Sequence, residues 1–173
     1  MRRIFALLLV FGLVFGLVAC AAEETPEPET TTTITTTEPT TTIGPLVRLY
    51  LPSPDGTQAF ITMDVETDGT PQYIVQLLME HGALPQGSEL LQLEQTWAAN
   101  DNYSTADMNQ AFLVGLLQLG SHGELMVIAS LVNSLLGYSG PGNLANVTIT
   151  VEGQTLETGH EIYDYPLEYF DFS

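Results

Sequence analysis

Hydrophobic and polar residues alternate along several short stretches of the chain, which is the pattern of strands with one buried face. Residues 46–52 and 59–66 show it in part, and the turn sequence Ser-Pro-Asp-Gly separates them, so we expect two strands there. The clearest alternation is in residues 146–153, where valine and isoleucine point to one side and threonine and glutamate to the other. Residues 89–97, and a short stretch from Tyr103, complete the expected strands.

Two other segments place apolar residues at helical spacing. The first, residues 71–81, has proline at its first position, and Gly82 after it can end a helix in a left-handed conformation. The second, about residues 122–136, is apolar over most of its surface, so we expect a well-buried helix. Residues 107–112 are ambiguous between a strand end and a helical turn, and in residues 113–119 the spacing decides neither type.

Strands and helices interleave along the chain without the repeated order of a parallel sheet. We therefore expect an α+β fold, in which two main helices pack on one face of a small mixed or antiparallel sheet. Residues 46–173 have a normal length for one domain.

The first twenty residues have the composition of an export signal. The sequence Met-Arg-Arg precedes the uncharged residues 4–18, a run shorter than the about 20 residues of a membrane-spanning helix. The sequence Leu-Val-Ala-Cys20 resembles the lipobox of bacterial lipoproteins, which implies cleavage before Cys20 and a diacylglycerol on its thiol. The alternative is ordinary secretion with cleavage after Ala21, because Ala-Cys-Ala also fits the small-residue cleavage pattern.

Composition divides the chain into three segments, a signal peptide (1–19), a linker that starts with the lipidated cysteine (20–45) and a domain (46–173). The linker is rich in Thr, Glu and Pro, and it has too little apolar surface to offset the entropy of ordering it. We expect it to be disordered, open to O-glycosylation and able to reach about 75 Å. Cys20 is the single cysteine in the chain, so it forms no internal disulfide.

The chain is strongly acidic, with 21 Asp and Glu residues against three Lys and Arg and a formal net charge of −18. Arg48 is the only basic residue of the domain apart from histidines. Such a charge repels phosphate-rich partners, so we expect no nucleic acid partner. Cations or basic proteins fit this charge better.

The sequence Gly-Ser-His-Gly-Glu at residues 120–124 contains side chains of a hydrolytic site. Ser121 and His122 are adjacent at an expected helix start, however, where neighbouring side chains point apart. Ser121 and Glu124 instead have the S-x-x-E spacing of a capping box, in which each side chain binds the other residue's amide. We interpret them as structural helix caps and expect no catalytic residues.

Two patterns concern metals. Residues 64–69 imitate the start of a calcium loop, but the twelfth position, which needs a bidentate glutamate, is Val75. We expect a solvated strand edge and turn there, with weak calcium binding as the alternative. His81, His122 and His160 lie far apart in sequence, so we expect no metal site and no cofactor. The spacing of carboxylates in sequence does not decide whether two of them meet for glycoside cleavage.

The end of the chain combines aromatic residues with carboxylates. Exposed aromatic side chains anchor protein interfaces well, but they can also cover a sheet edge or complete a core. The candidate interaction surface that this predicts consists of Tyr163, Tyr165, Tyr169, Phe170 and Phe172.

An ordered set of segments covers nearly all of residues 46–173: LVRLYLPSPDG, LLMEHG, LPQGSELLQL, ADMNQAF, GSHGELMVIASLVNSLLG and NVTITVEGQ. This set resembles the GerMN domain family. The resemblance implies an extracytoplasmic lipoprotein of the sporulation and germination type and a fold similar to ring-building-motif domains, and it carries over no catalytic residue. The chain departs from the family in Glu152, where aspartate is more usual, in its acidity and in its long tail after Gly153. It also has one copy where some relatives have a tandem pair, which weakens any expectation of ring assembly.

Together these features predict a non-enzymatic lipoprotein on the outer face of the bacterial cytoplasmic membrane, anchored through Cys20. Its domain is expected to bind other envelope proteins, in sporulation, germination or cell-envelope processes, and self-association is left open. The alternative is an extracytoplasmic ligand-binding or sensor module for cell-wall fragments or divalent cations.

Overall fold

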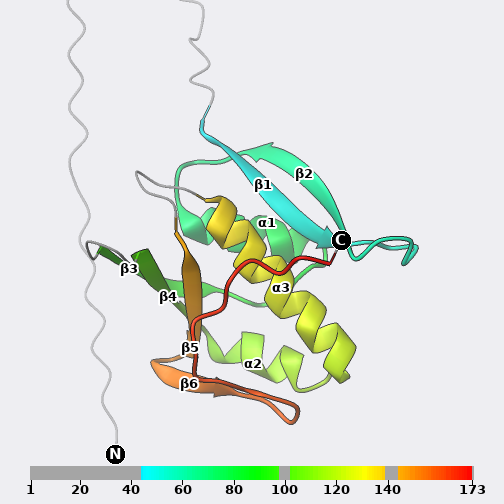
Figure 1. Ribbon diagram of the computed structural model, residues 1–173, viewed down its shortest axis with the longest axis vertical. Coiled ribbons are helices and arrows are strands. Elements are labelled where there is room, and N and C mark those ends of the chain that lie inside the picture. Colours follow the sequence, from blue (N-terminus) through cyan, green and yellow to red (C-terminus); the bar gives the residue numbers. More distant parts are fainter. Residues whose placement is uncertain (1–43, 98–101, 139–143, 173) are drawn as a thin grey trace, which may run out of the picture. The chain divides into compact units, whose positions relative to one another are not determined.

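The computed structural model describes residues 44–97, 102–138 and 144–172, which contain three helices and seven strands (Figure 1). The predicted α+β class is confirmed. The strands lie in two sheets, a hairpin of two strands and a mixed sheet of five. The predicted signal peptide, Cys20 and the linker up to residue 43 lie outside the described residues.

The hairpin is formed by β1 (Leu46–Pro52) and β2 (Phe60–Glu66), which pair antiparallel over their full lengths. Alternate residues of β1 are buried, as its sequence pattern predicts, and this face packs against α3 (Ser121–Gly137). The backbone amide of Tyr50 donates a hydrogen bond to the Ser134 hydroxyl of α3 at 3.0 Å. The helix therefore satisfies one backbone donor of the hairpin.

The five-stranded sheet has the order β3-β4-β5-β6-β7. Its bounds are Leu90–Trp97 for β3, Asn102–Met108 for β4, Asn146–Val151 for β5, Gln154–Glu157 for β6 and Ile162–Tyr163 for β7. Strands β4 and β5 run parallel and the other neighbours antiparallel. A parallel pair needs a long crossover connection, which here contains two helices.

Helix α1 (Pro71–Glu80) begins and ends as expected: the Thr70 hydroxyl accepts a hydrogen bond from the Tyr73 amide, and Gly82 has φ +73°. The ambiguous segment after β4 forms the short helix α2 (Gln110–Leu116). Within the described ranges, no helix has both the length and the apolar character needed to cross a membrane.

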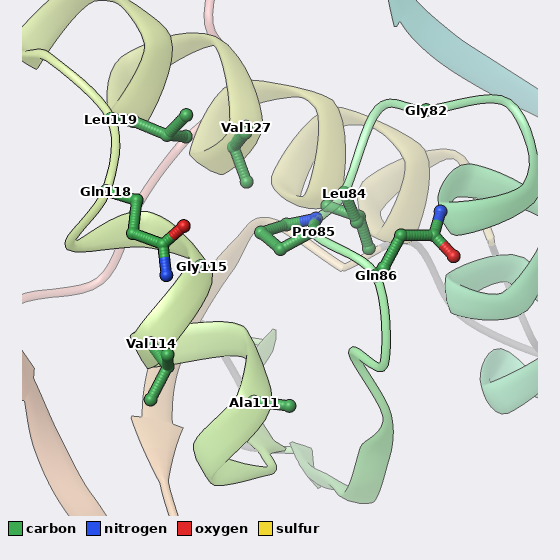
Figure 2. Close-up of a pocket in the computed structure, with 10 residues that line it drawn as sticks. All are labelled: Gly82, Leu84, Pro85, Gln86, Ala111, Val114, Gly115, Gln118, Leu119 and Val127. Carbon is green, nitrogen blue, oxygen red and sulfur yellow. The ribbon is translucent and has the colours of Figure 1, made fainter.

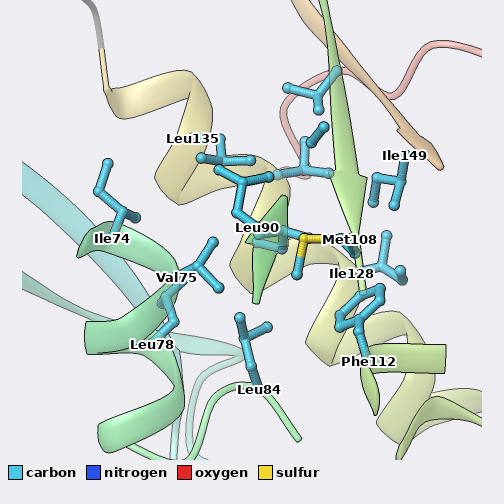
Figure 3. Packing of buried hydrophobic residues seen from close by; sticks show 14 of the residues in the cluster. Ile74, Val75, Leu78, Leu84, Leu90, Met108, Phe112, Ile128, Leu135 and Ile149 are labelled. Atoms are coloured by element: carbon cyan, nitrogen blue, oxygen red, sulfur yellow. The ribbon is translucent and has the colours of Figure 1, made fainter. Parts of the chain in front are cut away.

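Helix α3 lies at the centre of the core, and side chains from both sheets and the other two helices pack around it. Figure 3 shows Phe112 of α2, Met108 of β4 and Ile149 of β5 meeting Ile128 of α3. The largest fully buried apolar side chains are Phe112, Leu49, Ile74, Leu78, Met108, Leu116, Ile128, Leu131, Leu135, Ile149 and Leu156.

The capping box predicted at the start of α3 is wrong. Gly120 occupies the cap position, without a side-chain hydrogen bond, and Ser121 is already the first helical residue. Glu124 is only 2% exposed, and its carboxylate accepts hydrogen bonds from Thr158 and Tyr163, which lie 34 and 39 residues further along the chain. The S-x-x-E spacing takes only neighbouring residues into account. In the folded protein, the hydroxyl groups of two distant residues bind the Glu124 side chain, which therefore does not cap the helix.

Candidate interaction surface

The five aromatic residues predicted to form an interaction surface divide into two groups. Tyr165, Tyr169 and Phe172 are exposed, at 44%, 52% and 42%. Phe170 is half-buried and packs against the core, and Tyr163 is buried, at 6% exposure. The prediction was therefore wrong for Tyr163, whose ring completes the core because its hydroxyl has a buried partner.

That partner is Glu124 of α3. The Tyr163 hydroxyl and the Thr158 hydroxyl both donate to Glu124 Oε1, at 2.8 Å each. Burial raises the pKa of Tyr163, and the hydrogen bond to Glu124 raises it further. These two hydrogen bonds tie the start of the C-terminal segment to the helix.

We call residues 158–172 the tail. In addition to the contacts that Thr158 and Tyr163 make with Glu124, the tail is held at two further points. Leu167 exchanges two backbone hydrogen bonds with Val147 of β5, at 2.8 and 2.9 Å. The buried amide of Asn133 donates to the Phe170 carbonyl at 3.0 Å and accepts from the Phe170 amide at 2.9 Å. The tail (red in Figure 1) therefore crosses α3 and reaches the β1–β2 hairpin.

At the hairpin, two tail residues meet two hairpin residues to form what we call the aromatic surface: Tyr50, Phe60, Tyr169 and Phe172. The ring centroids of Tyr50 and Tyr169 are 5.7 Å apart, and those of Phe60 and Phe172 are 5.3 Å apart. Tyr50 and Phe60 meet edge to face at 6.4 Å. These separations lie in the range that favours aromatic pairs. A hollow of about 230 Å³ opens among them.

Tyr50 and Phe60 were not predicted as members of this surface. Both lie on the outer face of the hairpin, with Tyr50 opposite Thr62 and Phe60 opposite Pro52. The alternation of apolar and polar residues along each strand indicates only which face of the hairpin each side chain lies on. The cross-strand register and the path of the tail, which bring the four rings together, are not encoded in that local pattern.

Next to the aromatic surface, Arg48 and Asp64 form an ion pair with two hydrogen bonds, at 2.8 and 3.1 Å. The Arg48 guanidinium lowers the pKa of Asp64 through its hydrogen bond and its charge. Asp68 accepts hydrogen bonds from the amide and hydroxyl of Thr70. Two carboxylates of the calcium-like sequence, those of Asp64 and Asp68, are thus engaged within the protein. Among the residues that the structure describes, no three His, Cys, Asp or Glu side chains are placed to hold a metal.

A hydrolytic site at residues 120–124 finds no support in the geometry. Glu124 points into the core, where its carboxylate binds Tyr163 and Thr158. His122 lines a hollow of about 640 Å³ beside the β1–β2 connection, and no carboxylate or cysteine shares this lining. A catalytic histidine needs an orienting group within hydrogen-bond reach, and Glu124 does not serve as one.

Another recess is the groove between α2, α3 and the connection that follows α1, with a volume of about 560 Å³ (Figure 2). Leu84, Val114, Leu119 and Val127 line it, and none of its lining residues is titratable. Gly115 lets α2 approach the connection closely, because a Cβ there would overlap the Pro85 ring. The groove can accept apolar groups, but it holds no group for acid–base or nucleophilic chemistry.

Comparison with known structures supports the fold. The structure described as "First GerMN domain of the sporulation protein GerM from Bacillus subtilis" is similar with a TM-score of 0.54 and 14% identity, covering 73% of this chain and 99% of that one. The "Putative Lipoprotein from Clostridium perfringens" gives a TM-score of 0.45 and 16% identity, covering 73% of this chain and 89% of that one. At 14% identity the first likeness establishes the fold, which is that of a GerMN domain.

The family follows from the sequence match. Residues 48–157 match the Germane family, described as "Sporulation and spore germination", and the chain belongs to this family. Among curated protein sequences, none matches the chain significantly. The family resemblance predicted from the ordered segments is thereby confirmed. Neither the family description nor the names of the two structures attributes a reaction to them.

Proposed function

We propose that this protein is a lipoprotein of the cell envelope, anchored through Cys20, whose GerMN domain acts by binding other proteins outside the cytoplasmic membrane. The process is sporulation, germination or a related envelope function, in keeping with the family description. The lipobox-like sequence before Cys20 and the Thr-rich linker support the anchor and its distance from the membrane.

The observation that carries the binding role is the aromatic surface. Its exposed rings belong to Tyr169 and Phe172, in a tail whose backbone is fixed by Asn133 and Leu167. Aromatic residues dominate the binding energy of many protein interfaces. Rings that are held before binding lose little conformational entropy on association, which favours affinity.

We also propose that the protein is not an enzyme. Of the two recesses that α3 lines, the groove beside α2 has no titratable lining residue, and the hollow beside the β1–β2 connection has one, His122. An acid–base pair or an activated nucleophile would need at least two cooperating groups. The carboxylate nearest to His122 in sequence, Glu124, is engaged in the core.

Site-specific photocrosslinking in intact cells tests the binding role. A benzoylphenylalanine placed at position 172 of the full-length chain should form adducts with envelope proteins. The same group at position 165 is the matched control, because Tyr165 lies in the same tail, is similarly exposed and contacts Tyr163 instead of the hairpin. Equal adducts at both positions, or adducts at neither, would refute a binding role for the aromatic surface.

Substitution of Cys20 tests the anchor. In Cys20→Ser cells the protein should leave the membrane fraction or keep its signal segment, because no thiol is present to accept the lipid. Retention of the mature, processed protein in the membrane would contradict lipidation at Cys20. It would not affect the binding role, which is tested separately.

A further inference from the structure

We infer that the aromatic surface binds a basic segment of a partner protein, in which Arg or Lys side chains lie against the rings of Tyr169 and Phe172. This inference rests on the proposed function, because it specifies the chemistry of the partner. It combines three properties of the domain: its charge, the geometry of the rings and the way in which the tail is held.

The charge of the domain favours a cationic partner. From residue 46 to the end of the chain, Arg48 is the only Lys or Arg residue, and the chain as a whole has a formal net charge of −18. Arg48 adjoins the aromatic surface, but Asp64 pairs with it through two hydrogen bonds. A basic segment is therefore attracted over long range and does not meet an unpaired like charge at this point.

The rings provide the short-range contact. Cations are attracted to the electron-rich faces of aromatic rings, and the planar guanidinium of arginine also stacks on them. Tyr169 and Phe172 are about half exposed, while Tyr50 and Phe60 support them from the hairpin. The hollow among these rings is also lined by Gln58 and Thr62, side chains with hydrogen-bond acceptors for a guanidinium or ammonium group.

The aromatic surface combines residues inside the range that matches the family with residues beyond that range. The hairpin residues lie inside the matched range, 48–157, and Tyr169 and Phe172 lie beyond it. The tail therefore adds the exposed half of the surface to a hairpin that belongs to the family domain. A neutral glycan would gain nothing from the acidic charge, and anionic wall polymers would be repelled by it, so a basic protein segment fits best.

Peptide binding by the full-length chain in detergent micelles tests this inference. The probe is a fluorescein-labelled peptide of eight alternating Arg and Gly residues, measured by anisotropy at physiological salt. Tyr169→Leu with Phe172→Leu keeps apolar side chains but removes both rings, and it should weaken binding by about tenfold. Tyr165→Leu is the matched control and should change binding by less than about twofold, since its ring lies outside the surface.

Further probes decide between charge and ring recognition. A Lys-Gly peptide should bind more weakly than the Arg-Gly peptide, because only arginine both stacks on rings and carries charge. Equal binding by wild type and the double variant would overturn the inference, because attraction would then come from net charge alone. Displacement of the Arg-Gly peptide by chitotetraose at the same rings would overturn it in favour of a glycan surface.

The result of the peptide-binding experiment can be separated from the result of the photocrosslinking experiment that tests the proposed function. If the Arg-Gly peptide fails to bind while adducts persist at position 172 in cells, the basic partner is refuted and protein binding stands. If neither is observed, both are refuted. Thermal unfolding of each variant confirms that the exposed substitutions leave the domain folded.

Discussion

The family-matched part of the domain and the tail are held in place by different interactions. Between residues 48 and 157, apolar side chains from three helices and both sheets bury one another around α3. Figure 3 shows those from the helices and the five-stranded sheet. Of the tail, residues 158–172, the side chains of Tyr163 and Leu167 are buried in this core. Hydrogen bonds to Glu124 and Asn133 and a backbone bridge to Val147 also position the tail. The burial of apolar side chains stabilises the fold without requiring a particular direction, whereas a hydrogen bond requires a particular distance and angle between its two groups.

This difference explains the unusual composition of α3. A helix so deeply buried carries four buried polar side chains, Glu124, Ser130, Asn133 and Ser134. Glu124 and Asn133 hold the tail, and Ser134 holds the backbone of β1. The hairpin and the tail are the two parts that form the aromatic surface, so three of these four polar residues, Glu124, Asn133 and Ser134, position the parts that form it.

The largest effect is expected in the matched part. Phe112→Ala removes a fully buried ring from the core and should lower the free energy of unfolding by about 3–5 kcal/mol, measured by urea denaturation. Val114→Ala in the same helix, where the side chain is 47% exposed, should cost less than about 0.5 kcal/mol. Similar losses for the two variants would mean that α2 does not pack as described.

The tail responds to a polar substitution in α3. Asn133→Ala should lower the free energy of unfolding by about 1–3 kcal/mol, because it leaves backbone groups of Phe170 without their partner. Hydrogen exchange at the Phe170 amide should accelerate more than exchange within α3. Ser130→Ala is the control: its hydroxyl has no hydrogen-bond partner among the described residues, so its loss should be nearly neutral. Unchanged exchange at Phe170 in Asn133→Ala would contradict this role of the amide.

The start of the tail should show a pH dependence. Tyr163→Phe removes one hydrogen bond to Glu124 and should lower the free energy of unfolding by about 1 kcal/mol at neutral pH. The folded-state pKa of Tyr163 is raised, so its contribution is fully present below its unfolded pKa of about 10 and decreases as the pH rises above it. The difference between wild type and variant should therefore shrink in alkaline solution, with Tyr165→Phe as the control. If the difference in free energy of unfolding between wild type and Tyr163→Phe stays constant above pH 10, the raised folded-state pKa of Tyr163 is contradicted.

The smallest effect concerns the β5–β6 turn, which leads from the matched sheet toward the tail. Glu152 and Gly153 both have positive φ, 50° and 75°, between the paired residues Val151 and Gln154. Asparagine adopts this conformation more easily than glutamate, so Glu152→Asn should raise the free energy of unfolding by about 0.5–1 kcal/mol. Glu157→Asn, at an exposed strand position, is the control and should not stabilise. A lower melting temperature for Glu152→Asn would refute the turn assignment.

Local pattern was sufficient for most of the fold. The strands of the hairpin, the strand at residues 146–151, both longer helices and the α+β class were predicted from spacing and turn residues. Helix α2 was not, because its apolar residues have no period that separates strand from helix. The division of the strands into two sheets depends on pairings between distant segments, which no local pattern specifies.

The candidate surface was only partly predictable. Composition indicated that the aromatic tail was unusual, but it could not show that Tyr163 enters the core while Tyr169 and Phe172 stay exposed. It also could not reveal Tyr50 and Phe60, since their neighbours come from a tail more than a hundred residues away. The same limitation explains the error at Ser121 and Glu124, where local spacing predicted a cap.

The sequence by itself determined most of the elements, the family and the acidic charge of this protein, because propensity, periodicity and net charge are local or additive properties. Only the tertiary structure decided which polar residue meets which partner. Glu124 meets Tyr163, Asn133 meets Phe170, and the rings of the hairpin meet those of the tail. Each of these contacts joins segments far apart in the chain, and its energy depends on a distance and an angle that only the folded core provides.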